Sequence, residues 1–152
     1  MKARRFLLAV AVLASMVVMS HSVAFAQGTQ LFAVLLGGNE VSATGEADAG
    51  DQNGSGSATV IIPNSTTICF AILVTGIDTP VAAHIHAGTA GQNGPVVVPL
   101  TPPVLGNPGT SSRCVRNLDP VLVQRIRLTP SNYYVNVHTE DFPGGALRGQ
   151  LF

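Results

Sequence analysis

The sequence predicts an all-β fold, either a sandwich or a barrel. Three observations indicate this class: the apolar segments are short, they are rich in β-branched residues, and Gly, Pro, Asn or Ser bounds them at intervals of about 8–12 residues. Nothing resembles the alternation of strands and helices that is typical of a parallel α/β sheet. We therefore expect seven or eight strands.

The segment before the first expected strand has the pattern of an export signal. Basic residues within 2–5 are followed by an apolar run over 6–19, and Ala-Phe-Ala at 24–26 supplies a small-residue cleavage site. The run is shorter than the roughly 20 residues that a membrane span needs. We therefore expect a cleaved signal peptide over residues 1–26, one mature domain over 27–152, and a secreted location, extracellular or periplasmic, with no membrane span.

The composition of the mature chain limits its partners. Of the eight Lys and Arg residues, three lie in the signal segment, so five basic residues face eight acidic ones and the net charge is −3. A weakly acidic surface argues against nucleic acid and against an anionic membrane as partners. A domain of this length is large enough to bury a core of ordinary size.

The strand candidates follow one another with turn residues between them. TTICFAILVTG is the strongest candidate, because β-branched and aromatic residues run through it. A polar, Gly-rich loop over 42–57 separates the first candidate from the second. The expected strands are 30–36, 57–63, 66–76, 81–87, 95–100, 111–118, 132–139 and 146–152.

The segment DPVLVQRIRLTP departs from the strand pattern. Asp119 is suited to cap a helix, and Pro120 is suited to its first position. The apolar residues that follow have a roughly helical spacing. We therefore expect one short helix near residues 120–128.

Two cysteines, Cys69 and Cys114, remain in the mature chain. In an exported protein an even pair predicts a disulfide. Such a bond closes a loop of about 45 residues and stabilises the fold by about 4 kcal/mol on the chain-entropy model. Two separately buried thiols are the alternative interpretation, and metal ligation by the pair is a third.

The parity of the histidines is the most informative feature of the sequence. Side chains two residues apart in a strand lie on the same face. His84 and His86 therefore share a face, while Ile85 points to the other. In the segment YVNVHT the same rule places His138 beside Asn136 on a polar face, with the two valines opposite. Every histidine of the mature chain thus falls on a polar face.

Two interpretations of this face remain open. If the two strands are neighbours, three imidazoles come within reach of one point. Three imidazole ligands with an open position are typical of a catalytic Zn(II) or Cu(II) centre, which would make His84, His86 and His138 metal ligands. Alternatively, the imidazoles bond backbone carbonyls, Asn, Thr or carboxylates and fix a loop without a metal.

The C-terminal segment DFPGGALRGQLF adds an arginine to the same face. Pro-Gly-Gly at 143–145 predicts a tight turn that folds the last strand antiparallel to 132–139. With the leucines of that strand inside, Arg148 lies on the histidine face. It is either solvated or paired with a carboxylate at 140–141, or it guides an anion to a metal.

Several of these segments together resemble the chordin-domain (CHRD) family in its stand-alone bacterial secreted form. The resemblance rests on AAHIHAGTAGQNGPVVVPL, SSRC, YYVNVHTEDFPGGALRGQL and, near the mature N-terminus, LFAVLLGGNEV. It therefore covers essentially the whole mature chain. It implies an extracellular β-sandwich with a Cys69–Cys114 bridge. It implies no established chemistry, and the namesake of the family is an extracellular antagonist that binds growth factors.

A more distant resemblance is to the Cu/Zn superoxide dismutase sandwich, in which a His-x-His strand ligates copper on the outer face. This resemblance implies a Greek-key sandwich of immunoglobulin-like or superoxide dismutase-like type. It matches His84 and His86 to that pair and His138 to a later copper ligand. No histidine remains for a zinc subsite or a bridging ligand, so at most a copper-only site is implied.

Two functions follow from this reasoning. The leading prediction is a secreted, non-catalytic module that binds an extracellular protein, matrix or cell-wall component, or has a structural role. It is favoured because no nucleophile–base constellation is present. The alternative is a copper-binding protein that uses His84, His86 and His138, with Asn136 and Arg148 as neighbours. A copper-only, dismutase-like protein is one form of this alternative. Enzymatic activity is therefore the less favoured expectation.

Overall fold

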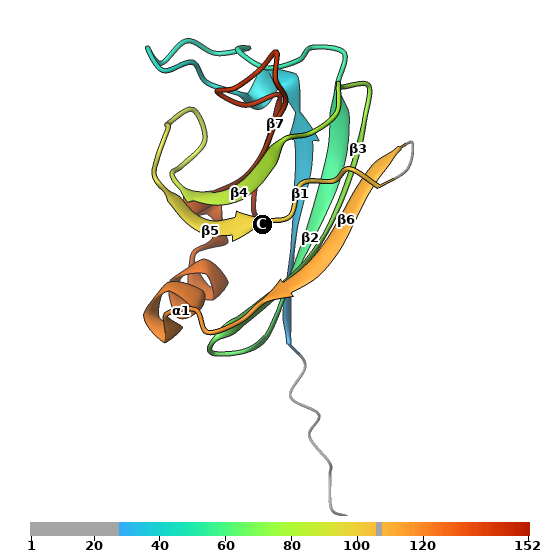
Figure 1. The fold of residues 1–152 in the computed structure, drawn as a ribbon. Helices are drawn as coiled ribbons and strands as arrows, with labels where there is room; N and C mark the ends of the chain where they lie inside the picture. The colour runs from blue at the N-terminus through green and yellow to red at the C-terminus, as the bar shows by residue number, and fades with distance from the viewer. Residues whose placement is uncertain (1–27, 106–107) are drawn as a thin grey trace, which may run out of the picture.

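The computed structural model describes residues 28–105 and 108–152, so the expected signal peptide lies outside the described residues. Within them the chain forms eight strands, all paired antiparallel, and one short α-helix (Figure 1), which confirms the all-β prediction. The strands are β1 Thr29–Leu36, β2 Ser55–Asn64, β3 Thr67–Thr75, β4 Ala82–Ala87, β5 Val96–Leu100, β6 Gly109–Val115, β7 Tyr133–His138 and β8 Leu147–Gln150.

The strands form one sheet in the order β5-β4-β7-β8-β1-β2-β3-β6. Its edge strands β5 and β6 contact each other, so the sheet is nearly closed like a barrel and has the character of a sandwich. β6 pairs with β3, and β7 pairs with β4. These crossovers are of the Greek-key type. They bring the two histidine-bearing strands side by side.

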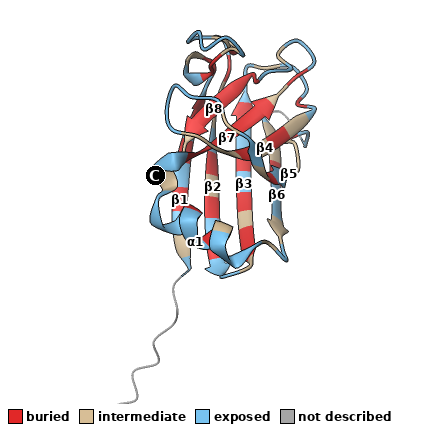
Figure 2. Cartoon of the chain, turned by 90° about the vertical axis from the view of Figure 1, so that its left-hand side faces the viewer, coloured by how far each residue is buried: buried red, intermediate tan, exposed pale blue. Residues whose placement is uncertain are grey.

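The core follows the period-2 pattern of the strands. Ile85, Val135 and Val137 are 0% exposed, as the parity argument predicts. Buried residues therefore alternate with outward-facing residues along β1, β2 and β3 (Figure 2), whereas β7 is buried on both faces from Tyr133 to Val137. The outer face of β4, β7 and β8 carries the polar side chains.

The helix α1 spans Pro120–Leu128 and confirms the expected helix. The Asp119 side chain accepts a hydrogen bond from the Val121 N–H at 2.9 Å, and proline occupies the first turn. Val123 and Ile126 are buried against the sheet. No helix of the described chain is long and apolar enough to cross a membrane.

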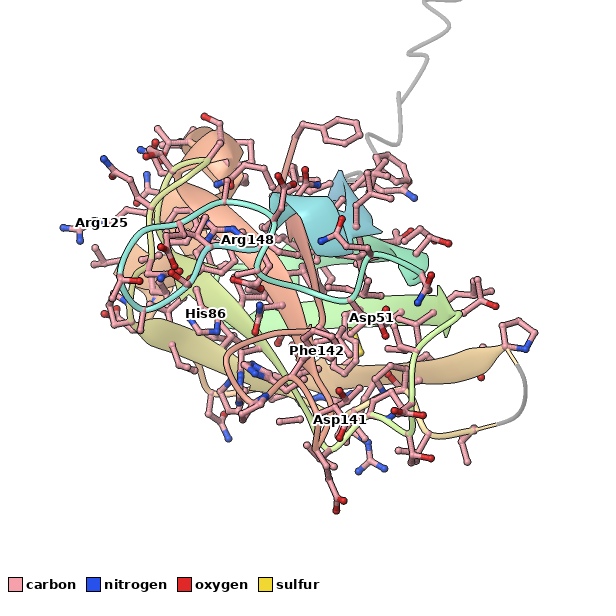
Figure 3. All side chains as sticks on the ribbon, turned by 90° about the horizontal axis from the view of Figure 1, so that it is seen from above. Asp51, His86, Arg125, Asp141, Phe142 and Arg148 are labelled. Carbon is pink, nitrogen blue, oxygen red and sulfur yellow. A yellow bond between two sulfur atoms is a disulfide. The ribbon has the colours of Figure 1, made fainter. Side chains whose placement is uncertain are left out.

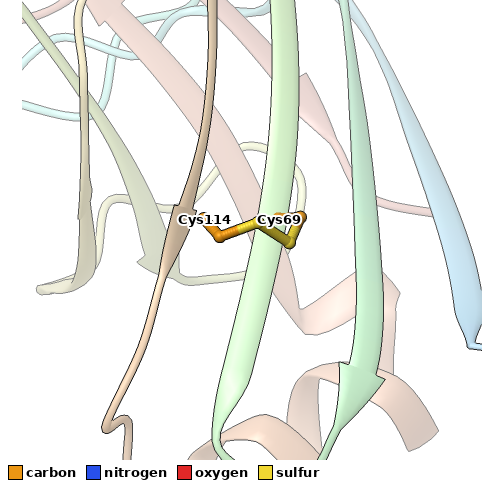
Figure 4. Close-up of a disulfide and its surroundings, with 2 residues drawn as sticks. All are labelled: Cys69 and Cys114. Carbon is orange, nitrogen blue, oxygen red and sulfur yellow. A yellow bond between two sulfur atoms is a disulfide. The ribbon is translucent and has the colours of Figure 1, made fainter.

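Cys69 and Cys114 lie directly opposite each other in the β3–β6 register and form a disulfide (Figure 4). This confirms the disulfide prediction and excludes the two alternatives for the pair. The bridge joins β6, an edge strand of the sheet, to its neighbour β3.

Candidate metal centre

The register of β4 against β7 brings the three histidines together. Ala82 lies opposite His138, and His84 lies opposite Asn136, so the imidazoles of His84 and His138 meet along a diagonal. His86 lies two residues further along β4 on the same face. One nitrogen from each ring lies within 4.8 Å of one nitrogen from each of the others. The structure thus brings together the three residues that the sequence singles out.

Backbone carbonyls orient two of the imidazoles. His86 Nδ1 lies 2.9 Å from the carbonyl oxygen of Gly94, and His138 Nδ1 lies 3.0 Å from that of Pro143. A carbonyl only accepts hydrogen bonds, so each Nδ1 is the protonated nitrogen and each Nε2 carries a lone pair. His84 Nδ1 lies 3.2 Å from His138 Nε2 and donates to it in the absence of another ligand. In the metal-free protein His84 therefore turns a protonated nitrogen toward His138, and it ligates a metal through Nδ1 only after that proton has moved to Nε2.

The environment keeps the imidazoles neutral. Burial lowers the pKa of all three below the ordinary value, and charge repulsion from His138 and then His86 lowers the pKa of His84 further. The bonds to Gly94 and Pro143 act in the opposite direction on the pKa of His86 and His138. Because only the neutral ring ligates a metal, a lowered pKa keeps the ligand form available over a wider pH range.

The rings of His86 and Tyr134 and the guanidinium of Arg148 form a stack on this face. The His86 ring is stacked on Tyr134, with centroids 4.8 Å apart and planes 10° from parallel. The guanidinium carbon of Arg148 lies 3.5 Å from the centroid of the Tyr134 ring. This cation–π contact and the aromatic stacking restrict the orientation of the His86 ring.

Arg148 lies on the histidine face, as the sequence predicts, but it is neither solvated nor paired with the carboxylates at 140–141. It is 1% exposed, and its guanidinium donates to the carbonyls of Thr89 and Gln92. Its charged partner is Glu40, at 3.9 Å. Seen from above, Arg148 lies within the outline of the loop after β1, whereas Arg125 projects at the periphery (Figure 3).

Glu40 and Asn136 form a second buried pair on this face. The Asn136 side-chain N–H donates to Glu40 Oε2 in a short hydrogen bond, and Glu40 Oε1 accepts from the Val41 backbone N–H. Burial raises the pKa of Glu40, while the Val41 bond, the Arg148 charge and the Asn136 bond act to lower the pKa. With both oxygens accepting and a guanidinium nearby, Glu40 has the pattern of a carboxylate.

A pocket of about 400 Å³ opens beside the cluster. His86 forms part of its wall, and Asn136, Glu40 and Tyr134 also line it. Residues of the loop after β1 and of the turn over 141–145 also line it. This volume is at the lower end of the range for small-molecule sites.

Sequence reasoning does not identify Glu40 as part of this face. Glu40 is 96 residues from Asn136 along the chain, and no periodicity connects them. The one available signal is that Glu40 is the single acidic residue of LFAVLLGGNEV, next to the turn residues that end the first strand. An isolated carboxylate in such a segment is a candidate for a buried partner.

The comparison with known families agrees with this architecture. The CHRD domain family matches residues 31–151, and the chain therefore belongs to the CHRD-domain family. CHRD domains are typically extracellular modules. No curated protein and no solved structure matches the chain significantly.

Proposed function

We propose that this CHRD domain is an exported copper-binding module in which His84, His86 and His138 are the ligands. His84 contributes Nδ1, whereas His86 and His138 contribute Nε2, because their Nδ1 atoms already donate to carbonyls. This second bond is what metal-ligating histidines commonly make, since it fixes the tautomer and the ring orientation.

The observation that carries the proposal is the state of His86 Nε2. This atom is buried and has no hydrogen-bond partner among the described residues. Leaving a buried acceptor unpaired costs about 1–3 kcal/mol. A metal ion bound by His84, His86 and His138 satisfies that lone pair.

The separations fit a shared ion after a small closure. Metal–imidazole bonds of about 2.0–2.1 Å place two ligand nitrogens on one ion about 3–4 Å apart. The 3.2 Å between His84 Nδ1 and His138 Nε2 lies within that range. The widest separation in the cluster, up to 4.8 Å, requires the rings to approach by about 1–2 Å.

Copper is the metal that this donor set favours. Neutral imidazole suits both Zn(II) and Cu(II), and Cu(II) binds more tightly than the other divalent first-row ions at a given site. Three ligands leave a position for an external molecule. When bound, copper supplies one-electron redox chemistry at that position.

Titration of the apo-protein with Cu(II), followed by electron paramagnetic resonance, tests the proposal. We expect one ion per chain, with hyperfine coupling from imidazole nitrogens. His86→Ala is expected to weaken binding at least about tenfold, because it removes one of three ligands. Val96→Ala is the matched control, since Val96 lies opposite His86 in the register and is exposed. Absence of nitrogen coupling, or equal affinity in the two variants, would refute the copper site.

A second candidate is a non-catalytic module that binds a protein or cell-wall component. The outer face of β1, β2 and β3 favours it, because this face exposes several large apolar side chains. They are Phe32, Val34, Leu36, Ile61 and Leu73. Retention of the metal-free protein by a cell-wall or matrix fraction, and its loss in Val34→Lys, would support this candidate. Equal retention of both proteins would exclude this face as the binding surface.

A further inference from the structure

Two buried side-chain atoms of the described chain lack a hydrogen-bond partner, and both belong to this site: His86 Nε2 and Asn136 Oδ1. Their residues line the same pocket of about 400 Å³. The proposed copper ion accounts for the first atom. It leaves the second without a partner, because an ion held by the three imidazoles does not use the amide oxygen.

The sheet places Asn136 in the middle of the histidine face. It lies opposite His84 on one neighbouring strand and opposite Arg148 on the other. It precedes His138 by two residues, so the two side chains share a face. Asn136 is 1% exposed, and its amide is therefore held among the side chains of this face.

Glu40 determines which end of the amide is free. A carboxylate only accepts hydrogen bonds, so the Asn136 NH₂ group must face Glu40, and Oδ1 points away from it. Arg148 holds Glu40 in place, and loop carbonyls hold Arg148. Gly145 closes the other side at φ +144°, where an added Cβ would overlap the Glu40 carboxylate and the Asn136 NH₂ group.

We infer that Asn136 is a specificity-determining residue whose Oδ1 accepts a hydrogen bond from the external ligand at the open position of the metal. This inference rests on the proposed copper site. A ligand that carries hydrogen, water above all, satisfies the amide oxygen. A simple anion such as azide brings lone pairs against it and is disfavoured. The site therefore selects protic ligands over anions.

Reversal of the amide tests this inference. In Glu40→Gln the new side-chain NH₂ can donate to Asn136 Oδ1, and the Asn136 amide then turns its NH₂ group toward the metal. We expect the azide affinity of the copper-loaded protein to rise about tenfold. Azide binding is measured by electron paramagnetic resonance and by the azide-to-copper charge-transfer band. Asn136→Ala removes the acceptor without reversing it and is expected to raise azide affinity by a smaller factor.

Glu140→Gln is the matched control. It removes one negative charge from an exposed glutamate two residues after His138, and it leaves the amide untouched. Copper affinity and the melting temperature are measured for every variant, so a folding defect is seen directly. Azide affinity unchanged in both Glu40→Gln and Asn136→Ala, or raised equally in Glu140→Gln, overturns the inference while the copper site stands. Failure of the wild type to bind copper refutes the proposed function and the inference together.

Discussion

Removal of the Cys69–Cys114 bridge is expected to lower the free energy of unfolding by about 4 kcal/mol. The two residues are 45 positions apart, and on the chain-entropy model closing a loop of that length restricts the unfolded chain by this amount. Both cysteines are only partly buried on the outer face of the sheet, so their replacement removes little contact from the core. The effect should therefore come mainly from the unfolded state.

The double variant Cys69→Ala/Cys114→Ala measures the contribution of the disulfide to the free energy of unfolding. Urea unfolding of the variant and of the oxidised wild type at the same pH gives the two free energies, and the m value of the variant should rise because its unfolded chain is less compact. Ser112→Ala is the control, since Ser112 is an exposed residue of the same strand, β6. A loss below about 1 kcal/mol with an unchanged m value would refute the reasoning. A domain stability of about 5–15 kcal/mol is large enough for a 4 kcal/mol change to be measured.

Three further predictions concern the histidine face. Burial lowers the pKa of His84, His86 and His138 below 6.5 in the folded state, so the unfolded chain takes up protons first. The unfolding free energy of the metal-free protein should therefore fall as the pH drops below about 6.5. In the variant with all three histidines replaced by Gln, urea unfolding should show a weaker dependence of this free energy on pH. Free Cu(II) at 100 times its dissociation constant should raise the unfolding free energy of the wild type by about 2.7 kcal/mol, with no change in the Gln variant, as measured by thermal unfolding. Gly145→Ala should lower the unfolding free energy by about 1–3 kcal/mol or more in urea, because its φ of +144° and its contact with Glu40 both disfavour a Cβ.

The fold was largely predictable because its strands alternate. Each strand candidate lies within a few residues of an observed strand, and the helix occupies the expected range. Parity alone placed Ile85 in the core and the histidines outside, because a strand allows only two faces. The turn over 143–145 then placed Arg148 on the correct face. These inferences use only local geometry, and the structure agrees with them for that reason.

The buried network around Arg148 was not predictable by the same reasoning. Arg148 contacts Glu40 and carbonyls of the loop after β4, and both are distant from Arg148 in the sequence. Parity specifies a face of the sheet but not what covers that face. An outward-facing arginine was therefore expected in solvent or beside the carboxylates at 140–141, whereas loops from elsewhere in the chain bury it completely. The solvated interpretation and the pairing with a carboxylate at 140–141 were wrong for this reason, and the carboxylate partner is Glu40.

The two interpretations of the histidines share two hydrogen bonds and differ in how the remaining ring nitrogens are used. In both of them the Nδ1 atoms of His86 and His138 hold loop carbonyls in place. A purely structural network would also pair the remaining nitrogens, and His84 with His138 does so. His86 breaks this pattern, because one nitrogen is bonded while the other is buried and bare. That arrangement lowers stability unless something binds there, and a metal ion uses the buried lone pair directly.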